Sequence, residues 1–327
     1  MSDLAADRAR AEARQRSQSR LNLLLSLTLL GLLILLWVAL ALSTRTFLTE
    51  INITNLMRQA YLVAILAVGQ TFVIITGGID LSVGAVIGFC SVILALLLKA
   101  PVSIPVAILL TLALGVAIGA FHGFGIVQLG LPPFIMTLAT LTALRGIGFL
   151  ITNGSTISGL PEAFTSFAPS TFLGIPSLFW MVVVVGAPSY VFLHHTRWGR
   201  YLFAIGSNPE AARLTGINVK GMIYLAYILS AFLAAVAAVL TTSRLSIGTQ
   251  NTGQGLELQA IAASVIGGTS LFGAVGSING PLLGSFLLTT IANGANLLNV
   301  NPFWQLIITG ALIIVIVYLD QLRRRGR

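Results

Sequence analysis

Long stretches without a charged residue dominate the chain. They cover residues 21–44, 59–79, 81–98, 100–144, 163–196, 221–243 and 258–319. A helix rises about 1.5 Å per residue, so a bilayer core of about 30 Å needs about 20 residues. The stretches are rich in Leu, Ile, Val and Ala and lack the period-two alternation of a barrel strand. The pattern therefore predicts an all-α, polytopic membrane protein.

Dividing these stretches at their prolines and glycine pairs gives ten predicted membrane helices. They cover 21–43, 59–77, 81–98, 103–125, 134–151, 178–195, 221–242, 258–272, 276–293 and 303–319. Pro132-Pro133 breaks the uncharged stretch 100–144 into two helices, because proline removes a backbone donor and clashes with the preceding turn. An even number of crossings puts both termini on one side. Eight crossings would do the same if the short helices near 258–293 are re-entrant.

Charge gives the orientation and the domain organisation. Charged residues make up only 8% of the 327 residues, too few for a soluble protein. Of the 18 Lys and Arg, 13 fall in 1–20, 196–220 or 321–327, which the positive-inside rule places in the cytoplasm. We expect basic cytoplasmic tails at 1–20 and 321–327 around one membrane domain, 21–320, whose first apolar stretch is too long for a cleaved signal. Orientation explains the net charge of +9, and no extramembrane domain remains to bind nucleic acid.

Signatures of enzymes are absent from the sequence. There is no G-x-x-x-x-G-K-[ST] loop for ATP, no H-E-x-x-H and no G-x-S-x-G. The single cysteine, Cys90, allows no disulfide within the chain, and His194 and His195 are expected at a cytoplasmic helix end. We therefore expect no catalytic residue, metal or cofactor in this chain, and a function in movement across the membrane.

The most informative polar segment is Gly77-Gly78-Ile79-Asp80-Leu81-Ser82-Val83-Gly84. A glycine pair weakens a helix, and Asp80 is placed to cap a new helix from Leu81 by accepting from the amide of Ser82 or Val83. Asp80 is also the one acidic residue clearly within the apolar part of the sequence. Two interpretations stay open: Asp80 lies on a substrate path between broken helices, or it only caps a helix at a turn.

A second glycine pair repeats the first one. Gly267-Gly268-Thr269-Ser270-Leu271 has the same G-G-x-[D/S]-L spacing, which suggests an internal repeat with the substrate route between its halves. Chance clustering of glycines is the alternative. The glycines at i+4 spacing, Gly115, Gly119 and Gly123 and then Gly276, Gly280 and Gly284, indicate close helix packing. Arg145 is interpreted as the end of a helix rather than as an interior ion pair.

The longest polar stretch between predicted helices is 196–220. Within it Asn208 can cap a short helix, Pro209 suits its first turn, Glu210 suits its positive end, and Gly216 can stop it. Ala211, Ala212 and Arg213 complete its turns. A helix this short is unstable alone in water, so it must pack against its own membrane domain or another protein.

These segments resemble a known family. The octet 77–84, the stretch from Asn208 to Gly216, the late segment 267–273 and the stretches 293–298 and 302–305 are similar to motifs of the permease subunits of bacterial ABC importers of the ribose, xylose and galactoside type. The resemblance covers about residues 45–320. Ala274-Val275 departs from it, since the family commonly has a further glycine there, and this leaves the sugar open.

The resemblance implies a machine with several partners in a bacterial inner membrane. Two permease copies, or this chain and a sister permease, would flank a central path, with ATP-binding subunits beneath and a sugar-binding protein outside. ATP and Mg²⁺ would bind on the partners. The helix from Pro209 to Thr215 would be the coupling helix, and the path or its hinges would be shaped by Gly77, Gly78, Asp80, Ser82, Gly267 and Gly268.

Other cargoes and other classes of protein remain as alternatives. The same machine could carry branched-chain amino acids, nucleosides or a signalling furanose. An ion-coupled secondary transporter is a second class, although such carriers usually need several intramembrane carboxylates. A membrane scaffold without transport is a third, and it would have no need of the two glycine breaks.

Overall fold

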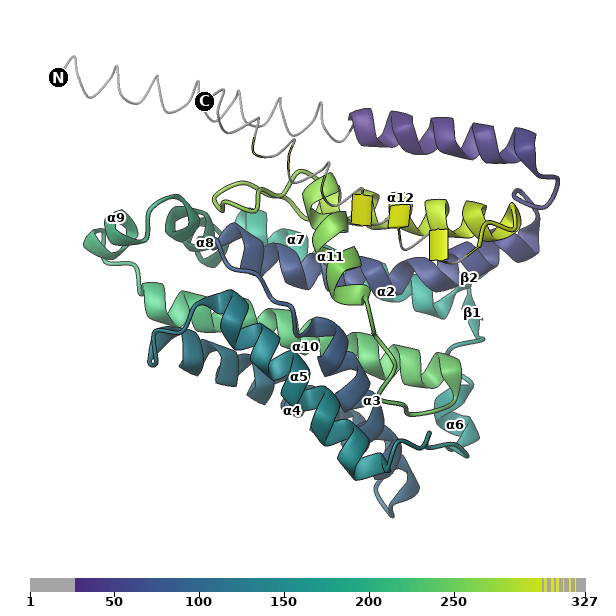
Figure 1. Ribbon diagram of the computed structural model, residues 1–327, viewed down its shortest axis with the longest axis horizontal. Coiled ribbons are helices and arrows are strands. Elements are labelled where there is room, and N and C mark those ends of the chain that lie inside the picture. Colours follow the sequence, from purple (N-terminus) through teal and green to yellow (C-terminus); the bar gives the residue numbers. More distant parts are fainter. Residues whose placement is uncertain are drawn as a thin grey trace.

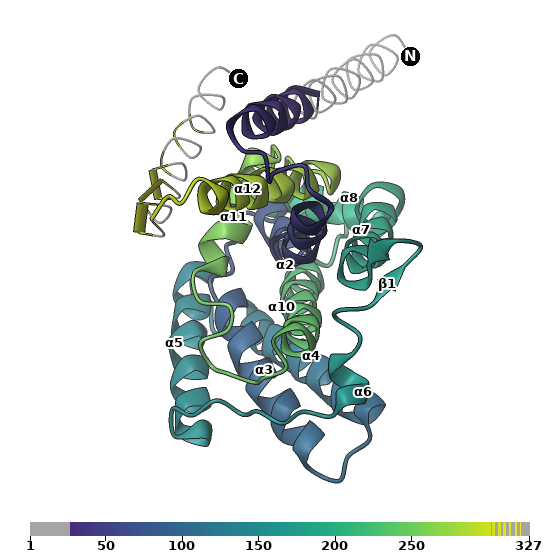
Figure 2. The ribbon, with the colours of Figure 1, turned by 90° about the vertical axis from the view of Figure 1, so that its right-hand side faces the viewer.

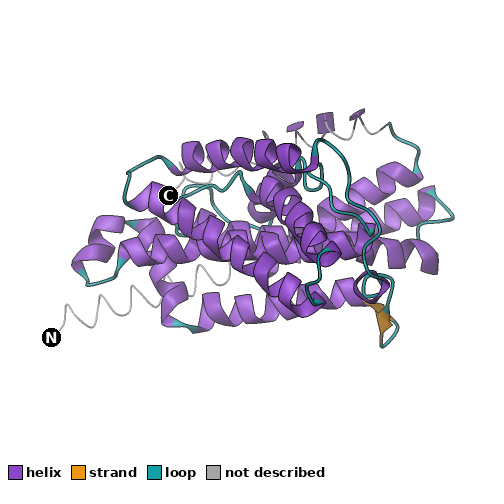
Figure 3. Cartoon of the chain, turned by 90° about the horizontal axis from the view of Figure 1, so that it is seen from below, coloured by secondary structure: helices purple, strands orange, loops and turns teal. Residues whose placement is uncertain are grey.

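The computed structural model describes residues 27–301 and, beyond them, residues 303, 304, 307, 308, 310, 311, 314, 318 and 321. These residues are mostly helical, with loops between the helices and one short pair of strands (Figure 3). Within them a first helix covers Leu27–Ser43. The other elements are α2 (Glu50–Ile75), α3 (Val83–Lys99), α4 (Ile104–Val127), α5 (Pro133–Thr152), α6 (Glu162–Thr165), β1 (Thr171–Phe172), β2 (Ile175–Pro176), α7 (Ser177–His195), α8 (Arg197–Ser207), α9 (Pro209–Leu214), α10 (Val219–Leu245), α11 (Leu256–Ile266) and α12 (Asn279–Leu297).

The predicted all-α, polytopic membrane class is confirmed. In the described part of the chain, α2, α4, α5, α7 and α10 are long and apolar enough to cross a membrane. The count of ten is not established, because the predicted helix 303–319 lies mostly outside the described residues and 21–43 partly so. The predicted tails, 1–20 and all of 321–327 except residue 321, also lie outside them.

Most predicted boundaries are close to the observed ones, and α2 differs most. It begins at Glu50 rather than at residue 59, and the Thr49 hydroxyl accepts from Asn52 N–H at its start. The charged Arg58 lies inside the helix, so a boundary drawn where charge disappears falls more than two turns late. The short hairpin of β1 and β2 was not expected in an all-α chain.

α11 is too short to be the crossing predicted at 258–272. Its 11 residues span about 16 Å, about half of a bilayer core. The helix ends at Ile266, and the glycine pair that follows lies outside it. Residues 258–272 therefore do not form the single continuous crossing helix that was predicted, and the re-entrant alternative stays a prediction.

The bundle has two distinct ends and a buried centre. α8 and α9 lie at one end, here called the α9 end, while α6 and the hairpin lie at the other, the hairpin end (Figure 1). Seen along the bundle, α2 and α10 lie at the centre (Figure 2). In the most apolar 18 residues of each helix, 83% are buried in α2 but only 28% in α4 and in α5. The outer helices α4 and α5 therefore leave most of their apolar side chains at the surface of the chain.

α4 packs closely on α10 through its glycines, as their spacing predicts. A Cβ at Gly115 would overlap the Ala231 carbonyl oxygen, and one at Gly119 would overlap the Tyr227 carbonyl and Ile228 Cα. Small residues at this spacing let two helix backbones come together. Gly280 and Gly284 on α12 likewise lie against the backbone of Gly267 and Ala263.

We expect Gly119→Val to separate α4 from α10 and strongly destabilise the chain. The added side chain would overlap backbone atoms of α10, which cannot move away as a side chain can. Overpacking of this kind costs about 1–3 kcal/mol or more. Thermal unfolding in detergent would measure it. Gly146→Val on α5, where nothing lies within 4 Å of the new Cβ, is the matched control.

Two non-helical segments enter the bundle from opposite ends. Residues 76–82 leave α2 at the α9 end and turn back beside α10 before α3 begins at Val83. Residues 246–255 leave α10 at the hairpin end and run along α3, where Gly88 and Gly84 leave room for their backbone. An antiparallel bridge between Ile157 and Gly248 anchors the entry of the second segment. The first turns of α3 and α11 thus meet inside the bundle.

Candidate functional site

Asp80 lies completely buried where the first non-helical segment reaches α3. Its Oδ1 accepts from Ser82 N–H (2.9 Å) and Ser82 Oγ (2.6 Å), and its Oδ2 accepts from Ser230 Oγ on α10 (2.8 Å). The predicted bond to the Ser82 amide is confirmed. The predicted start at Leu81 is wrong by two residues, since α3 begins at Val83 with Ser82 as its N-cap. Asp80 therefore joins the α2–α3 break to α10.

The backbone of Asp80 is held as firmly as its side chain. With its amide turned to satisfy both groups, the Gln70 side chain donates to the Asp80 carbonyl and accepts from the Asp80 N–H, both at 3.1 Å. Thr137 Oγ1 on α5 donates to the Ile79 carbonyl at 3.3 Å. Helices on three sides thus fix the first non-helical segment. Gln70 is part of this site, yet the sequence places it inside an apolar run with no motif.

Two aromatic residues with unpaired polar atoms lie beside Asp80. His122 on α4 and Tyr227 on α10 make an edge-to-face contact with ring centroids 6.0 Å apart, and both are buried. Neither nitrogen of His122 nor the Tyr227 hydroxyl has a hydrogen-bond partner. A Cβ at Gly78 would overlap that hydroxyl, so Gly78 is required for close approach. We call Asp80, Ser82, His122, Tyr227 and Ser230 the buried polar cluster.

The two glycine-rich segments, which were suspected to be repeats, meet at the α9 end. Ala274 N–H donates to the Ile75 carbonyl at 2.9 Å, which ties the second segment to the end of α2. Gly206 on α8 lies against the Ile75 carbonyl oxygen and the Ala274 nitrogen, and a Cβ at Gly206 would overlap both atoms. The two glycine pairs differ in backbone conformation, because the positive φ belongs to the first glycine of one pair, Gly77 (+82°), and to the second glycine of the other, Gly268 (+90°). Gly267, the counterpart of Gly77, has φ −65°. The internal repeat therefore stays a prediction.

The short helix predicted in 196–220 is present as α9, and α8 precedes it unpredicted. The Asn208 side chain accepts from the N–H groups of Glu210 and Ala211, both at 3.0 Å, and Gly216 follows the helix with φ +83°. Ala212 is buried against the bundle, whereas Leu214 is 80% exposed. α9 is therefore anchored on one side and presents an apolar side chain on the other.

Arg145 forms a partly exposed ion pair between α5 and α11, so its interpretation as a helix end is wrong. It lies within α5, and its Nη2 is 3.4 Å from Oε1 of Glu257 in the first turn of α11. Asp80 is consequently not the one acidic residue in the apolar part of the chain. The sequence hides this pair because its two members are 112 residues apart.

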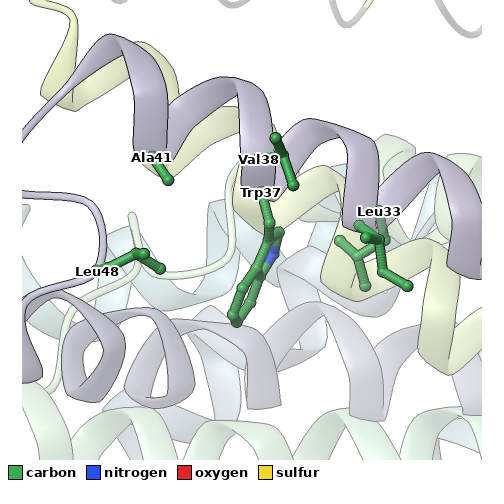
Figure 4. A pocket seen from close by; sticks show the side chains of 6 residues that line it. Leu33, Trp37, Val38, Ala41 and Leu48 are labelled. Atoms are coloured by element: carbon green, nitrogen blue, oxygen red, sulfur yellow. The ribbon is translucent and has the colours of Figure 1, made fainter.

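An apolar groove lies away from these polar groups, against the first helix. Leu33, Ile34, Trp37, Val38, Ala41 and Leu48 line it, and Trp37 projects across it (Figure 4). The exposed atoms of its lining are apolar, so the groove suits a lipid chain rather than a polar solute. In the part of the chain that the structure describes, no group of three or more His, Cys, Asp or Glu could hold a metal ion.

Comparison with known proteins assigns the chain to a family. The family model described as "Branched-chain amino acid transport system / permease component" matches residues 52–317. The chain is 41% identical over 286 residues to the ribose import permease protein RbsC of Bacillus subtilis (strain 168), covering 87% of this chain and 89% of that one.

Relatives with other printed cargoes are similar over comparable lengths. The D-allose transport system permease protein AlsC of Escherichia coli (strain K12) is 36% identical, covering 86% of this chain and 87% of its own. The autoinducer 2 import system permease protein LsrC of Salmonella choleraesuis (strain SC-B67) is 35% identical, covering 84% and 79%. No solved structure gives a significant match. With its buried polar breaks and its membrane helices, this chain belongs to the branched-chain amino acid transport system permease family.

Proposed function

We propose that this chain is the membrane-spanning subunit of an ATP-driven importer for a sugar. The relatives named for ribose, D-allose and autoinducer 2 import support a hydroxyl-rich cargo. The chain itself performs no ATP hydrolysis in this proposal; ATP and Mg²⁺ bind to partner ATP-binding subunits. The protein lies in a bacterial inner membrane with both termini in the cytoplasm, as the basic residues near the α9 end suggest.

α9 is the observation that carries the proposal. It is capped by Asn208, begins at Pro209, and holds Arg213 against Glu210 through an ion pair of 2.9 Å. A helix of six residues gains little stability alone, so this rigid form needs its caps and its anchor at Ala212. We assign it as the coupling helix, seated by Leu214 in a groove of the ATP-binding subunit.

The contacts around α9 supply a route for its motion. α8 precedes it and places Gly206 against Ile75 and Ala274, so movement of α9 reaches both glycine-rich segments. α10 follows it and bonds Asp80 through Ser230. The proposed hinge residues therefore lie where α8 and α10, the two helices next to the moving α9, contact the rest of the bundle. These residues are Gly77, Gly78, Asp80, Ser82, Gly267 and Gly268. Gly78, Asp80, Ser82 and Gly267 are buried here, which favours hinges over direct contact with solute.

The complete importer requires further subunits. A second copy of this chain, or a sister permease, completes the path, and a soluble sugar-binding protein delivers cargo at the hairpin end. Branched-chain amino acids and nucleosides are the alternative cargoes. An ion-coupled carrier working alone is the alternative mechanism, and Glu257 adds a second carboxylate that such a carrier could use.

Reconstitution in liposomes tests the proposal. We expect the chain with its ATP-binding subunit and sugar-binding protein to concentrate ribose, D-allose or a related sugar only when ATP is supplied. Leucine serves as the control cargo. Concentration of solute against its gradient by the chain alone would contradict the proposal, and uptake of leucine but no sugar would correct the cargo.

A further inference from the structure

Arg145 and Glu257 lie at membrane depth. Arg145 is seven residues before the end of α5, about 10 Å along the helix, and about 18 Å from its start. Glu257 lies against Gly84 of α3, about 22 Å along that helix from Lys99. Lys99 and the residues after α5 share the hairpin end, since Lys99 Nζ donates to the Ser158 carbonyl at 3.0 Å. The pair is thus well inside the span.

The pair and its neighbours reach the molecular surface. The side chains of Arg145 and Glu257 are 27% and 12% exposed. Asn251 and Gln254, in the non-helical segment that runs from Gly88 to Gly84 along α3, are exposed as well. Charged and amide groups at this depth are unfavourable against hydrocarbon, so such groups usually face a water-filled cavity. α5 also exposes Ile147, Leu150 and Ile151, so the surface that we infer does not face lipid is limited to Arg145, Asn251 and Gln254.

α4 provides the contrast within the same chain. Its exposed large side chains are all apolar, and they are Val106, Leu109, Leu110, Val116, Phe121 and Phe124. A lipid-facing surface has this composition. The exposed surface of α4 therefore lacks the polar side chains found around Arg145.

Three oxygen atoms beneath this surface have no hydrogen-bond partner. They are Glu257 Oε2, Gln250 Oε1 and Thr252 Oγ1, and all three atoms are buried. Gln250 Nε2 donates to the Leu144 carbonyl at 3.3 Å and its Oε1 lies against Gly148, while Glu257 Oε2 lies against Gly84. These acceptors face helix backbone, so the polar groups that a solute can contact are those of Arg145, Asn251 and Gln254.

We propose that this polar face, made of Arg145, Asn251, Gln254 and Glu257, lines the solute route and binds a hydroxyl-rich solute. The side-chain amides of Asn251 and Gln254 donate to and accept from solute hydroxyls, and Arg145 donates to solute oxygens. The inference rests on the proposed function for its choice of solute, whereas the polarity of the face rests on the structure alone.

Thiol labelling of the assembled importer tests the face without measuring transport. In a Cys90→Ala background, Asn251→Cys and Gln254→Cys are exposed to a charged, lipid-insoluble methanethiosulfonate on both sides of the membrane. We expect labelling at least tenfold faster than for Leu109→Cys and Val116→Cys on α4, because thiolates form in water and not in lipid. Rates as slow as on α4 would overturn the proposal.

Protection by sugar separates binding from water access. A transported sugar in excess is expected to slow labelling at Asn251→Cys by at least threefold, and Gln254→Ala is expected to remove that protection while labelling continues. Fast labelling without protection by any sugar would overturn hydroxyl binding and leave the water-filled route. An importer that moves no sugar contradicts the proposed function instead, and the labelling rates still decide whether the face is aqueous.

Discussion

Replacing Leu214 with aspartate is expected to lower ATP-driven uptake at least tenfold while the chain folds and inserts normally. Leu214 is 80% exposed at the end of α9, so the bundle gains little from its side chain. In the assembled importer the same leucine would be buried in the ATP-binding subunit. An aspartate there places an unpaired charge in an apolar contact and also lies at the negative end of the helix dipole.

Uptake and ATP hydrolysis in proteoliposomes would be measured together with the yield of folded chain. Leu129→Asp is the matched control, because Leu129 is 60% exposed in the turn after α4. This turn also lies at the α9 end, since the neighbouring Gln128 accepts from Tyr224 near the start of α10. Unchanged uptake in Leu214→Asp would contradict the coupling assignment. Equal losses in both variants would show a general effect of charge at the α9 end.

Asp80→Ala is expected to lower both stability and uptake, and uptake more. The substitution removes the acceptor for Ser82 N–H, Ser82 Oγ and Ser230 Oγ in a fully buried place. Each buried donor left unpaired costs about 1–3 kcal/mol. Asp80→Asn retains an acceptor oxygen for Ser82 and offers an amide donor to Ser230, so we expect it to unfold close to the wild-type temperature.

Ser230→Ala separates the hinge from the helix cap. It removes the one bond to Asp80 Oδ2 from α10, and it leaves both bonds from Ser82 intact. We expect a loss of uptake with a smaller fall in thermal unfolding temperature than for Asp80→Ala, because one buried acceptor rather than three buried donors loses its partner. Uptake that falls only in step with the amount of folded chain, in all three variants, would make Asp80 a structural cap and nothing more.

The sequence determined the features that depend on neighbouring residues. Long uncharged stretches are sufficient for membrane helices, because hydrocarbon leaves the backbone no other partner than itself. α9 was predicted with its cap and stop because Asn208, Pro209 and Gly216 act on their own turn. The close packing of α4 was predicted because its glycines recur at the helical period.

Only the tertiary structure decided how segments far apart in the chain meet. Arg145 was misinterpreted because its partner lies on α11, 112 residues away, and no local pattern pairs the two. α11 was expected to cross the membrane because an apolar composition does not show where the backbone leaves the helix at Gly267. Gln70 and Ser230 acquired their roles only when α2 and α10 enclosed Asp80. The role of a polar atom in the membrane interior depends on the partner that folding brings within hydrogen-bond distance of it. The order of residues in the sequence does not give that distance.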